Sequence, residues 1–463
     1  MVAAAAEQSP TYLTDQLAQQ VVRDQPRLAL KNLSLNLATF LAEGESSVDQ
    51  TLTQYRYSTM AEASAPLDVA SFESKRRNDN DELSLSIKTK DGDTVTFSFR
   101  YEAGFGGTDT QQGVGYQSLT VSYELDGELS EKEIDELAGL SEGLNALANS
   151  YFSGAGAQLA DLQLDQLSTV AELSLSLEGV GPGDIKLSMT DNDLLREYRI
   201  QMNGDTVEMS RDKLSLLGSS GSQRREAALN HYRQMLIEGV ERSHGGAGQQ
   251  ALMLDAFNLL HGENSDTENT FDLTDAESSL LTGLADFSFS FEGRARQSAA
   301  NPLFGGLVEQ MSLSLSQETR IRIDGPLTRT VDQRQNWMLK SSYFEPLPHL
   351  DSADFENHNY SYVSLEEQAQ VRNQVSMTDG RMSALQTQRF DSERNEMVFI
   401  EGELADWKTT RQSLHEIRDL TARLRSQSDN FDGILLEEIL LDPKQMAQRA
   451  ATETLEHDLS SAS

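Results

Sequence analysis

The sequence has no cysteine, few prolines and no long hydrophobic run. Its 463 residues include 0 Cys and 9 Pro. The absence of cysteine excludes disulfides, thiolate metal sites and a cysteine nucleophile. No hydrophobic run reaches the roughly 20 residues that a membrane-spanning helix needs, so we expect no membrane insertion.

Positive charge is also scarce. The chain has 38 Lys and Arg against 74 Asp and Glu, which gives a formal net charge of -36. A field of this sign repels nucleic acid and anionic lipid, and it favours solubility and contacts with cations or basic partners. A protein from a salty habitat would show the same balance. Residues 1–8 lack the basic segment and apolar core of a secretory signal, so we expect a soluble cytoplasmic protein without a nucleic-acid partner.

Alternating patterns dominate residues 82–179. Leu83, Leu85 and Ile87 fall on one face of a predicted strand, with Ser and Lys on the other face. This period of two predicts half-buried antiparallel strands. It recurs in four runs: 82–89, 94–100, 118–125 and 171–178.

A helix is predicted between the third and the fourth of these strands. Ser130 stands three residues before Glu133, which is the capping-box spacing. In a capping box each of the two side chains satisfies a free main-chain N–H at the start of the helix. An apolar stripe at spacings of three and four follows: Leu137, Leu140, Leu144 and Leu147.

A similar stretch follows a Gly/Ser linker and two helix candidates in residues 218–270. Thr274 and Glu277 repeat the capping-box spacing. Residues 285–293 match residues 171–179 in residue type at every position. We interpret this match either as a diverged internal repeat or as a convergent strand pattern.

Long strands and then helices are predicted in the last third of the chain. Strands rich in Gln, Arg and Asn leave one broad polar face in water. The turn Asp379-Gly380 is typical of a hairpin. Leu414, Ile417 and Leu420 have helical spacing, so helices are predicted from residue 409 onward. The predicted long strands are 329–344, 360–377 and 382–400.

We therefore predict an α+β protein: two antiparallel β-sheet units with embedded helices, joined by a helical connector, plus a C-terminal helix. The expected parts are an N-terminal helix and strand followed by a polar linker (1–75), a first β-α-β antiparallel unit (76–217), the helical connector (218–270), a second antiparallel sheet unit with long polar strands (271–408), and C-terminal helices with a frayed tail (409–463).

One motif points to hydrolase chemistry. Gly139-Leu-Ser-Glu-Gly143 fits G-x-S-x-G, which in α/β-hydrolases holds a nucleophilic serine on a tight turn between a strand and a helix. Ser141 instead lies well inside a predicted helix. Chance is the better explanation, and a serine hydrolase centred on Ser141 is the alternative.

The loop of residues 122–133 matches part of the frame of an EF-hand calcium site. Gly127 takes the glycine position and Glu133 the last, bidentate position, with Glu124 and Asp126 as further carboxylates. A serine replaces the first aspartate, and a strand rather than a helix comes before the loop. Glu133 serves either helix capping, which we favour, or a calcium-responsive site. The metal candidates are Glu124, Asp126 and Glu133.

Other candidate chemistry is sparse. The seven histidines show no metal-ligand spacing, and no phosphate-binding glycine motif occurs. Trp337 and Trp407 are interpreted as packing residues. We expect no catalytic residue, no cofactor and no enzyme activity.

Residues 83–179 carry a family resemblance. The segments Lys90–Phe99, Asp126–Glu133 and Ala146–Gly154 resemble a module of uncharacterised proteobacterial proteins, known as a domain of unknown function. The chain has Ala155 where such modules prefer an acidic residue. The resemblance implies a bacterial origin and a β-rich unit with an embedded helix, and it supplies no catalytic residues.

The leading functional hypothesis is a non-enzymatic interaction or scaffold protein. Its partner would be another protein, bound on the polar sheet of residues 329–400. The hydrolase at Ser141 and the calcium-responsive module at residues 122–133 are the alternatives from other classes.

Overall fold

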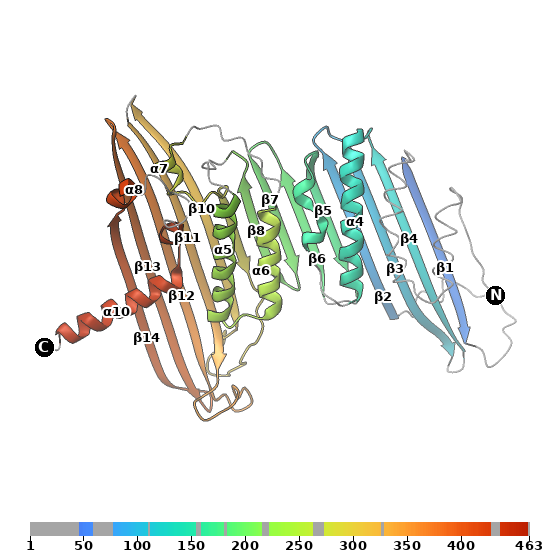
Figure 1. Cartoon of the computed structure of the whole chain (residues 1–463). Coiled ribbons are helices and arrows are strands. Elements are labelled where there is room, and N and C mark those ends of the chain that lie inside the picture. The colour runs from blue at the N-terminus through green and yellow to red at the C-terminus, as the bar shows by residue number, and fades with distance from the viewer. Residues whose placement is uncertain are drawn as a thin grey trace. The chain divides into compact units, whose positions relative to one another are not determined.

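The computed structural model describes residues 46–58, 77–109, 112–153, 159–179, 183–214, 222–262, 273–325, 328–426 and 436–461. These residues form a mixed α/β protein with mostly antiparallel strands and a C-terminal helix, α10 (Pro443–Ser461) (Figure 1). The elements predicted before residue 46 lie outside the described residues. None of the described helices is long and apolar enough to span a membrane.

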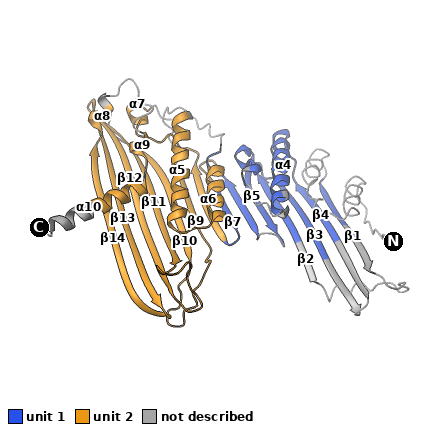
Figure 2. Cartoon of the chain, turned by 60° about the horizontal axis from the view of Figure 1, so that its bottom comes forward, with its two compact units in different colours: residues 1–192, 198–204, 261–264 blue, residues 193–197, 205–260, 265–463 orange. Residues whose placement is uncertain are grey.

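The chain divides into two compact units (Figure 2). Unit 1 comprises residues 1–192, 198–204 and 261–264, and unit 2 comprises residues 193–197, 205–260 and 265–463. Strand β7 (Leu195–Met202) is therefore shared between the two units.

The predicted strands of residues 82–178 are confirmed in unit 1. Leu83, Leu85 and Ile87 are buried, as their alternation required. Each neighbouring pair of strands is antiparallel. The strand order is β1 (Ser47–Ser58), β4 (Gln112–Asp126), β3 (Thr94–Asp109), β2 (Arg77–Thr89), β5 (Val170–Glu178) and β6 (Ile185–Asp191).

The predicted helix of unit 1 is α4 (Glu131–Ser153), and all four leucines of its stripe are buried. Two short 3-10 turns follow, η2 (Leu159–Leu162) and η3 (Leu164–Gln166). Glu136 ties the helix to the start of β5, because its Oε2 accepts from the main-chain N–H groups of Ser168 and Thr169, both at 2.9 Å.

The predicted long strands are confirmed in unit 2, whose strands follow one another in chain order. At the turn between β12 and β13, Asp379 and Gly380 have φ values of 50° and 73°, as a two-residue hairpin turn requires. The strands are β8 (Asp205–Asp212), β9 (Phe287–Glu292), β10 (Gln310–Gly325), β11 (Thr328–Glu345), β12 (Tyr360–Thr378), β13 (Arg381–Ile400) and β14 (Glu403–Asp419).

The two helices predicted in residues 218–270 are α5 (Ser222–Arg242) and α6 (Ala247–Leu260), and both belong to unit 2. Rather than bridging two sheets, they pack on one face of this unit's sheet (Figure 1). A Cβ at Gly239 of α5 would stand 2.7 Å from the ring of Trp337, so only glycine permits this approach. Tyr232 of α5 makes edge contacts with Phe257 and Phe287.

The structure corrects the prediction of helices from residue 409 onward. Residues 403–419 form strand β14, and helices begin only at α8 (Thr421–Ser426), followed by α9 (Leu436–Ile439). The helical spacing was misleading because its members do not share one buried side. Leu414 is 2% exposed, whereas Ile417 is 64% exposed.

The matching strands β5 and β9 are both internal and antiparallel to both neighbours. Their connections differ. One neighbour of β9 is β8, the strand that directly precedes the helices before β9. The strand that precedes α4 is β4, and it is not a neighbour of β5, which pairs with β2 and β6. The match between residues 171–179 and 285–293 therefore favours a convergent strand pattern.

One buried carboxyl of unit 2 gives a pH-dependent prediction. Burial raises the pKa of Asp286 from 3.8 to about 6, against the opposing hydrogen bonds from Thr319. Between about pH 4 and 6 the unfolded chain releases a proton that the folded chain keeps. The wild type should therefore lose about 2 kcal/mol relative to Asp286→Asn over this rise in pH. Urea unfolding of both proteins from pH 4 to 6.5 checks this; a constant difference would contradict it.

Candidate functional site

The sheet of unit 2 has two unlike faces. Successive strand residues point to opposite faces. On β11, Trp337 and Leu339 are buried beneath the helices, whereas Met338 and Lys340 are exposed on the other side. We call this second side the polar face.

One row of residues crosses the polar face of six strands in register. The Cα pairings join Glu292 to Ser312, Ser312 to Lys340, Lys340 to Glu366, Glu366 to Glu393, and Glu393 to Arg411. These residues line an open hollow of about 1010 Å³. Six strands separated by up to 119 residues in sequence, from Glu292 to Arg411, thus contribute to one surface.

The charges of the hollow are paired with one another. Lys340 Nζ lies 2.9 Å from Glu366 Oε1, and Arg411 Nε lies 2.8 Å from Glu393 Oε2. Hydrogen bonds from Arg411 and Asn395 lower the pKa of Glu393, which keeps this carboxylate ionised. The pairs are exposed, so a ligand can exchange partners with them at small cost.

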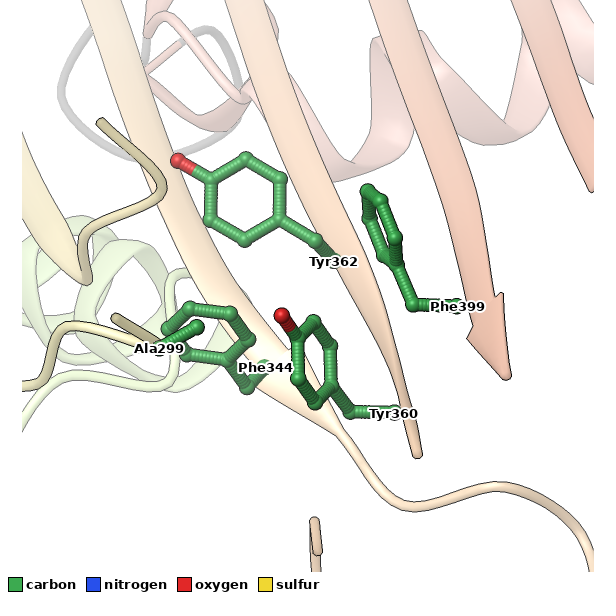
Figure 3. Close-up of a cluster of buried hydrophobic side chains, with 5 residues drawn as sticks. All are labelled: Ala299, Phe344, Tyr360, Tyr362 and Phe399. Carbon is green, nitrogen blue, oxygen red and sulfur yellow. The ribbon is translucent and has the colours of Figure 1, made fainter. Parts of the chain in front are cut away.

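An aromatic cluster, drawn in Figure 3, adjoins the hollow, because its member Tyr362 also lines the hollow. Phe344, Tyr360, Tyr362 and Phe399 meet in this cluster, with the Phe344 and Tyr360 rings 5.0 Å apart. The Tyr362 hydroxyl donates to the carbonyl of Val308 at 3.1 Å. Because these aromatic side chains are packed together and hydrogen-bonded, they form a rigid boundary beside the polar lining.

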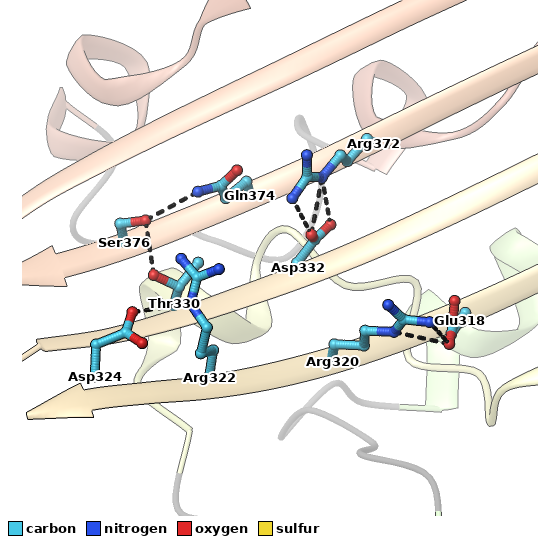
Figure 4. Close-up of polar contacts among 9 residues, drawn as sticks. All are labelled: Glu318, Arg320, Arg322, Asp324, Thr330, Asp332, Arg372, Gln374 and Ser376. Carbon is cyan, nitrogen blue, oxygen red and sulfur yellow. Dashed lines mark hydrogen bonds and ion pairs between the residues drawn. The ribbon is translucent and has the colours of Figure 1, made fainter.

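The polar face continues beyond the hollow as cross-strand and same-strand pairs (Figure 4). Arg372 Nε lies 2.9 and 2.8 Å from the two carboxylate oxygens of Asp332 on the neighbouring strand. Arg322 donates to Asp324 within β10 at 2.8 Å. Guanidinium groups held by carboxylates present an ordered pattern of donors and acceptors.

This arrangement suits reversible binding. The lining supplies serine hydroxyls, side-chain amides and three cations beside four carboxylates: Lys340, Arg389 and Arg411 with Glu292, Glu366, Asp391 and Glu393. Such a surface offers both donors and acceptors with nearly balanced charge. It can therefore recognise a partner surface that also alternates in charge.

Ser141 lies in the interior of α4 and is buried. It thus lacks the strand-to-helix turn of a nucleophile elbow. The second glycine of the motif has a packing role. A Cβ at Gly143 would stand 2.2 Å from the main-chain oxygen of Asp161, where η2 crosses the helix.

The three metal candidates are placed differently. Glu124 and Asp126 are exposed on β4, whereas Glu133 is buried in the first turn of α4. Glu133 Oε2 accepts from the Ser130 N–H at 2.7 Å and from its hydroxyl at 2.8 Å, so the predicted capping box is present. Within the described residues, no group of three or more His, Asp or Glu side chains could hold a metal ion.

The two tryptophans have opposite environments. Trp337 is buried, with the guanidinium of Arg242 5.9 Å from its ring centre, which fits the packing interpretation. Trp407 is 63% exposed on β14, so packing against the residues that the structure describes does not explain it.

Sequence reasoning identified the polar face of residues 329–400 and missed its extent. Residues of β9, β10 and β14 also line the hollow. The signal for β14 was the Glu401-Gly402 turn, whose φ values of 53° and 83° resemble those of Asp379-Gly380. No protein-family model matches this sequence, and no curated protein matches it either.

Proposed function

We propose that the chain is a non-enzymatic interaction protein that binds a protein partner on the polar face of unit 2. The row from Glu292 to Arg411 supports this most directly, because it aligns charged and hydroxyl groups over six strands in one open hollow. The partner would carry an alternating pattern of charges rather than a single sign.

Two properties of the hollow favour a macromolecular partner. The hollow is open and broad, and its groups are spread over six strands instead of converging on one point. Its ion pairs, such as Lys340 with Glu366, are solvent-exposed. Charges of this kind guide association and fix orientation more than they add affinity.

The two alternatives are less well supported. A hydrolase would need Ser141 exposed on a turn, and a calcium module would need Glu133 free of its capping bonds. A cytoplasmic location, a bacterial origin and the resemblance of residues 83–179 to a bacterial module remain part of the proposal.

A site-specific crosslinking experiment tests the proposal. A photoreactive amino acid at Gln368, inside the hollow, should capture a defined protein in cells of the source organism. The same amino acid at Ser188, on unit 1, is the position control.

The captured partner is then purified and its affinity measured by calorimetry. The double change Lys340→Glu and Arg411→Glu should weaken binding by about tenfold or more, because two favourable contacts become repulsive. Lys88→Glu with Lys186→Glu is the matched control, since both lysines are in exposed ion pairs of unit 1. Equal losses in the two double variants would exclude the polar face as the binding surface.

A further inference from the structure

Strand β14 ends the sheet of unit 2 and has an unusual edge. In the part of the chain that the structure describes, β13 is its one hydrogen-bonded neighbour. Residues 403–411 are exposed on both faces of the strand. A long exposed edge offers its main chain to another strand, and proteins commonly protect such edges. Trp407 lies in the middle of this segment and is 63% exposed.

Residues 403–411 carry negative charges before Trp407 and positive charges after it. Glu403 and Asp406 precede it, and Lys408 and Arg411 follow it. In an antiparallel pair of identical strands, the first half of one strand lies against the second half of the other. A second copy of this chain therefore brings the negative half of one strand against the positive half of the other.

We propose that two copies of the chain associate through β14, antiparallel and about a two-fold axis at Trp407. In this register Asp406 of each copy lies opposite Lys408 of the other copy, and the two Trp407 residues face each other. A two-fold interface forms each contact twice, so one sequence pair gives two ion pairs. Directly opposed charges and aromatic rings are stabilising cross-strand pairs.

The same charges disfavour neighbouring registers. An axis at Lys408 would place the two lysines opposite each other, and an axis at Asp406 would oppose the two aspartates. An axis between Trp407 and Lys408 would leave Asp406 opposite Thr409. Like charges directly opposite each other are destabilising, so the register centred on Trp407 is selected.

Local main-chain geometry limits the length of the new ladder. The register between β13 and β14 shifts near Ala405, where Leu404 pairs with Phe399 and Asp406 with Val398. The direct pairs therefore lie around residues 406–408. Glu403 and Arg411 lie outside these direct pairs. They contribute to association only through the opposite charges of the two ends of the segment.

The isolated strand already satisfies one edge donor. The Trp407 N–H donates to Oδ1 of its neighbour Asp406 at 2.9 Å. On association, the carbonyl of Trp407 in the other copy replaces this acceptor, and the Asp406 carboxylate turns to Lys408 of the other copy. The exchange keeps the Trp407 N–H hydrogen-bonded and the Asp406 carboxylate paired, so this contact buries no unsatisfied polar group.

The dimer is expected to be weak. A short strand pair is at the lower end of interface sizes, and two chains of formal charge -36 repel each other. We expect a dissociation constant on the order of 10 µM in about 0.15 M salt.

Sedimentation velocity of the full chain over a concentration series tests the proposal by charge exchange. Asp406→Lys alone and Lys408→Asp alone should each weaken association by about tenfold or more, because like charges then face each other twice. Mixing the two single variants should restore association as a mixed dimer. The double variant Asp406→Lys, Lys408→Asp should dimerise by itself.

Asp135→Lys and Lys132→Asp, both exposed on α4 of unit 1, are the matched controls and should associate like the wild type. A wild type that stays monomeric up to about 100 µM, ten times the expected constant, would overturn the proposal. A dimer that persists in the single variants, or single variants that do not associate when mixed, would overturn it as well. Asp406 and Lys408 do not line the hollow, so this result is independent of the proposed partner site.

Discussion

Replacing Glu277 by glutamine is expected to lower the free energy of unfolding by about 3 kcal/mol. Glu277 lies in the first turn of α7 (Asp275–Ser278) and is 1% exposed. Its Oε2 accepts from the Thr274 N–H at 2.8 Å and hydroxyl at 2.9 Å, and its Oε1 accepts from Arg329 Nε at 2.7 Å. Glutamine keeps the shape but leaves the half-buried guanidinium of Arg329 without its counter-charge.

The first capping box supplies the matched control. Glu133 accepts from Ser130 in the same geometry as Glu277 accepts from Thr274. Glu277 accepts in addition from Arg329. Glu133→Gln should therefore cost only about 1 kcal/mol, the value of a helix cap. Urea unfolding at pH 7, followed by circular dichroism, measures both losses. Equal losses would show that the pair with Arg329 adds nothing to the cap.

The pH dependence of this difference follows from the ion pair. Burial acts to raise the pKa of Glu277, but hydrogen bonds from Arg329 and Thr274 outweigh it, so the pKa lies below its usual value of 4.5. The stability that the carboxylate contributes is thus present above about pH 4.5 and is lost as the pH falls. The wild type and Glu277→Gln should converge in stability toward acid pH.

These two capping boxes also show how far sequence reasoning reaches. Both were predicted from a spacing of three residues, because capping is a local contact. Arg329 comes 52 residues after Glu277, and nothing in the spacing links the two. Local rules thus predicted the start of each helix and left the ion pair of the second to the tertiary fold.

The strands show the same limit. Alternation located β2, β3, β5 and the long strands correctly, since burial of one face fixes the period. It failed at β14, where Leu414 is buried but residues 403–411 face water on both sides. A strand exposed on both faces has no alternation to detect, so the helical spacing of a few apolar residues was misleading.

The polar character of the candidate site could be predicted from the sequence, but the set of strands that form it could not. Polar residues at every second position of residues 329–400 indicated that these strands have one polar face. The row from Glu292 to Arg411 depends on the registers of five strand pairs, and a shift of one residue in any of them would send a strand's polar side chains to the opposite face. Such registers depend on turns and packing along the whole sheet.

Gln335→Leu is expected to loosen the C-terminal segment of unit 2. Gln335 is fully buried on the helix-covered face of β11. Its Oε1 accepts from the Tyr232 hydroxyl at 3.0 Å and from the Leu441 N–H at 2.9 Å, and its Nε2 donates to the Ile439 carbonyl at 3.0 Å. One amide thus holds both α5 and the chain between α9 and α10.

Two further side-chain amides bind the same C-terminal segment. Asn373 Nδ2 donates to the Ile439 carbonyl at 2.9 Å, and Gln386 Nε2 donates to the Glu438 carbonyl at 2.6 Å. These side chains bind main-chain atoms, so the segment is fixed by its backbone and by the burial of Leu436, Ile439 and Leu441. Removing the central amide leaves the Leu441 N–H without the Gln335 acceptor.

The expected cost is about 2 kcal/mol, the penalty for a buried polar group that loses its partner. Much of it should act on local opening of the segment, because Asn373 and Gln386 hold only part of the main chain. A cost of about 2 kcal/mol corresponds to about a thirtyfold rise in the open population. Limited proteolysis with a dilute protease, followed by mass spectrometry, should show cleavage before residue 441 accelerated by about that factor.

Gln370→Leu is the control, since Gln370 is an amide on the polar face of β12 that bonds Asn336 at 2.7 Å. Its loss should change cleavage of the C-terminal segment by less than about twofold, because a half-buried surface amide can return to water. If Gln335→Leu lowers the global free energy of unfolding without faster cleavage of the segment, the amide stabilises the sheet as a whole. If cleavage accelerates at unchanged global stability, the segment opens by itself, and the buried amides are what keep it closed.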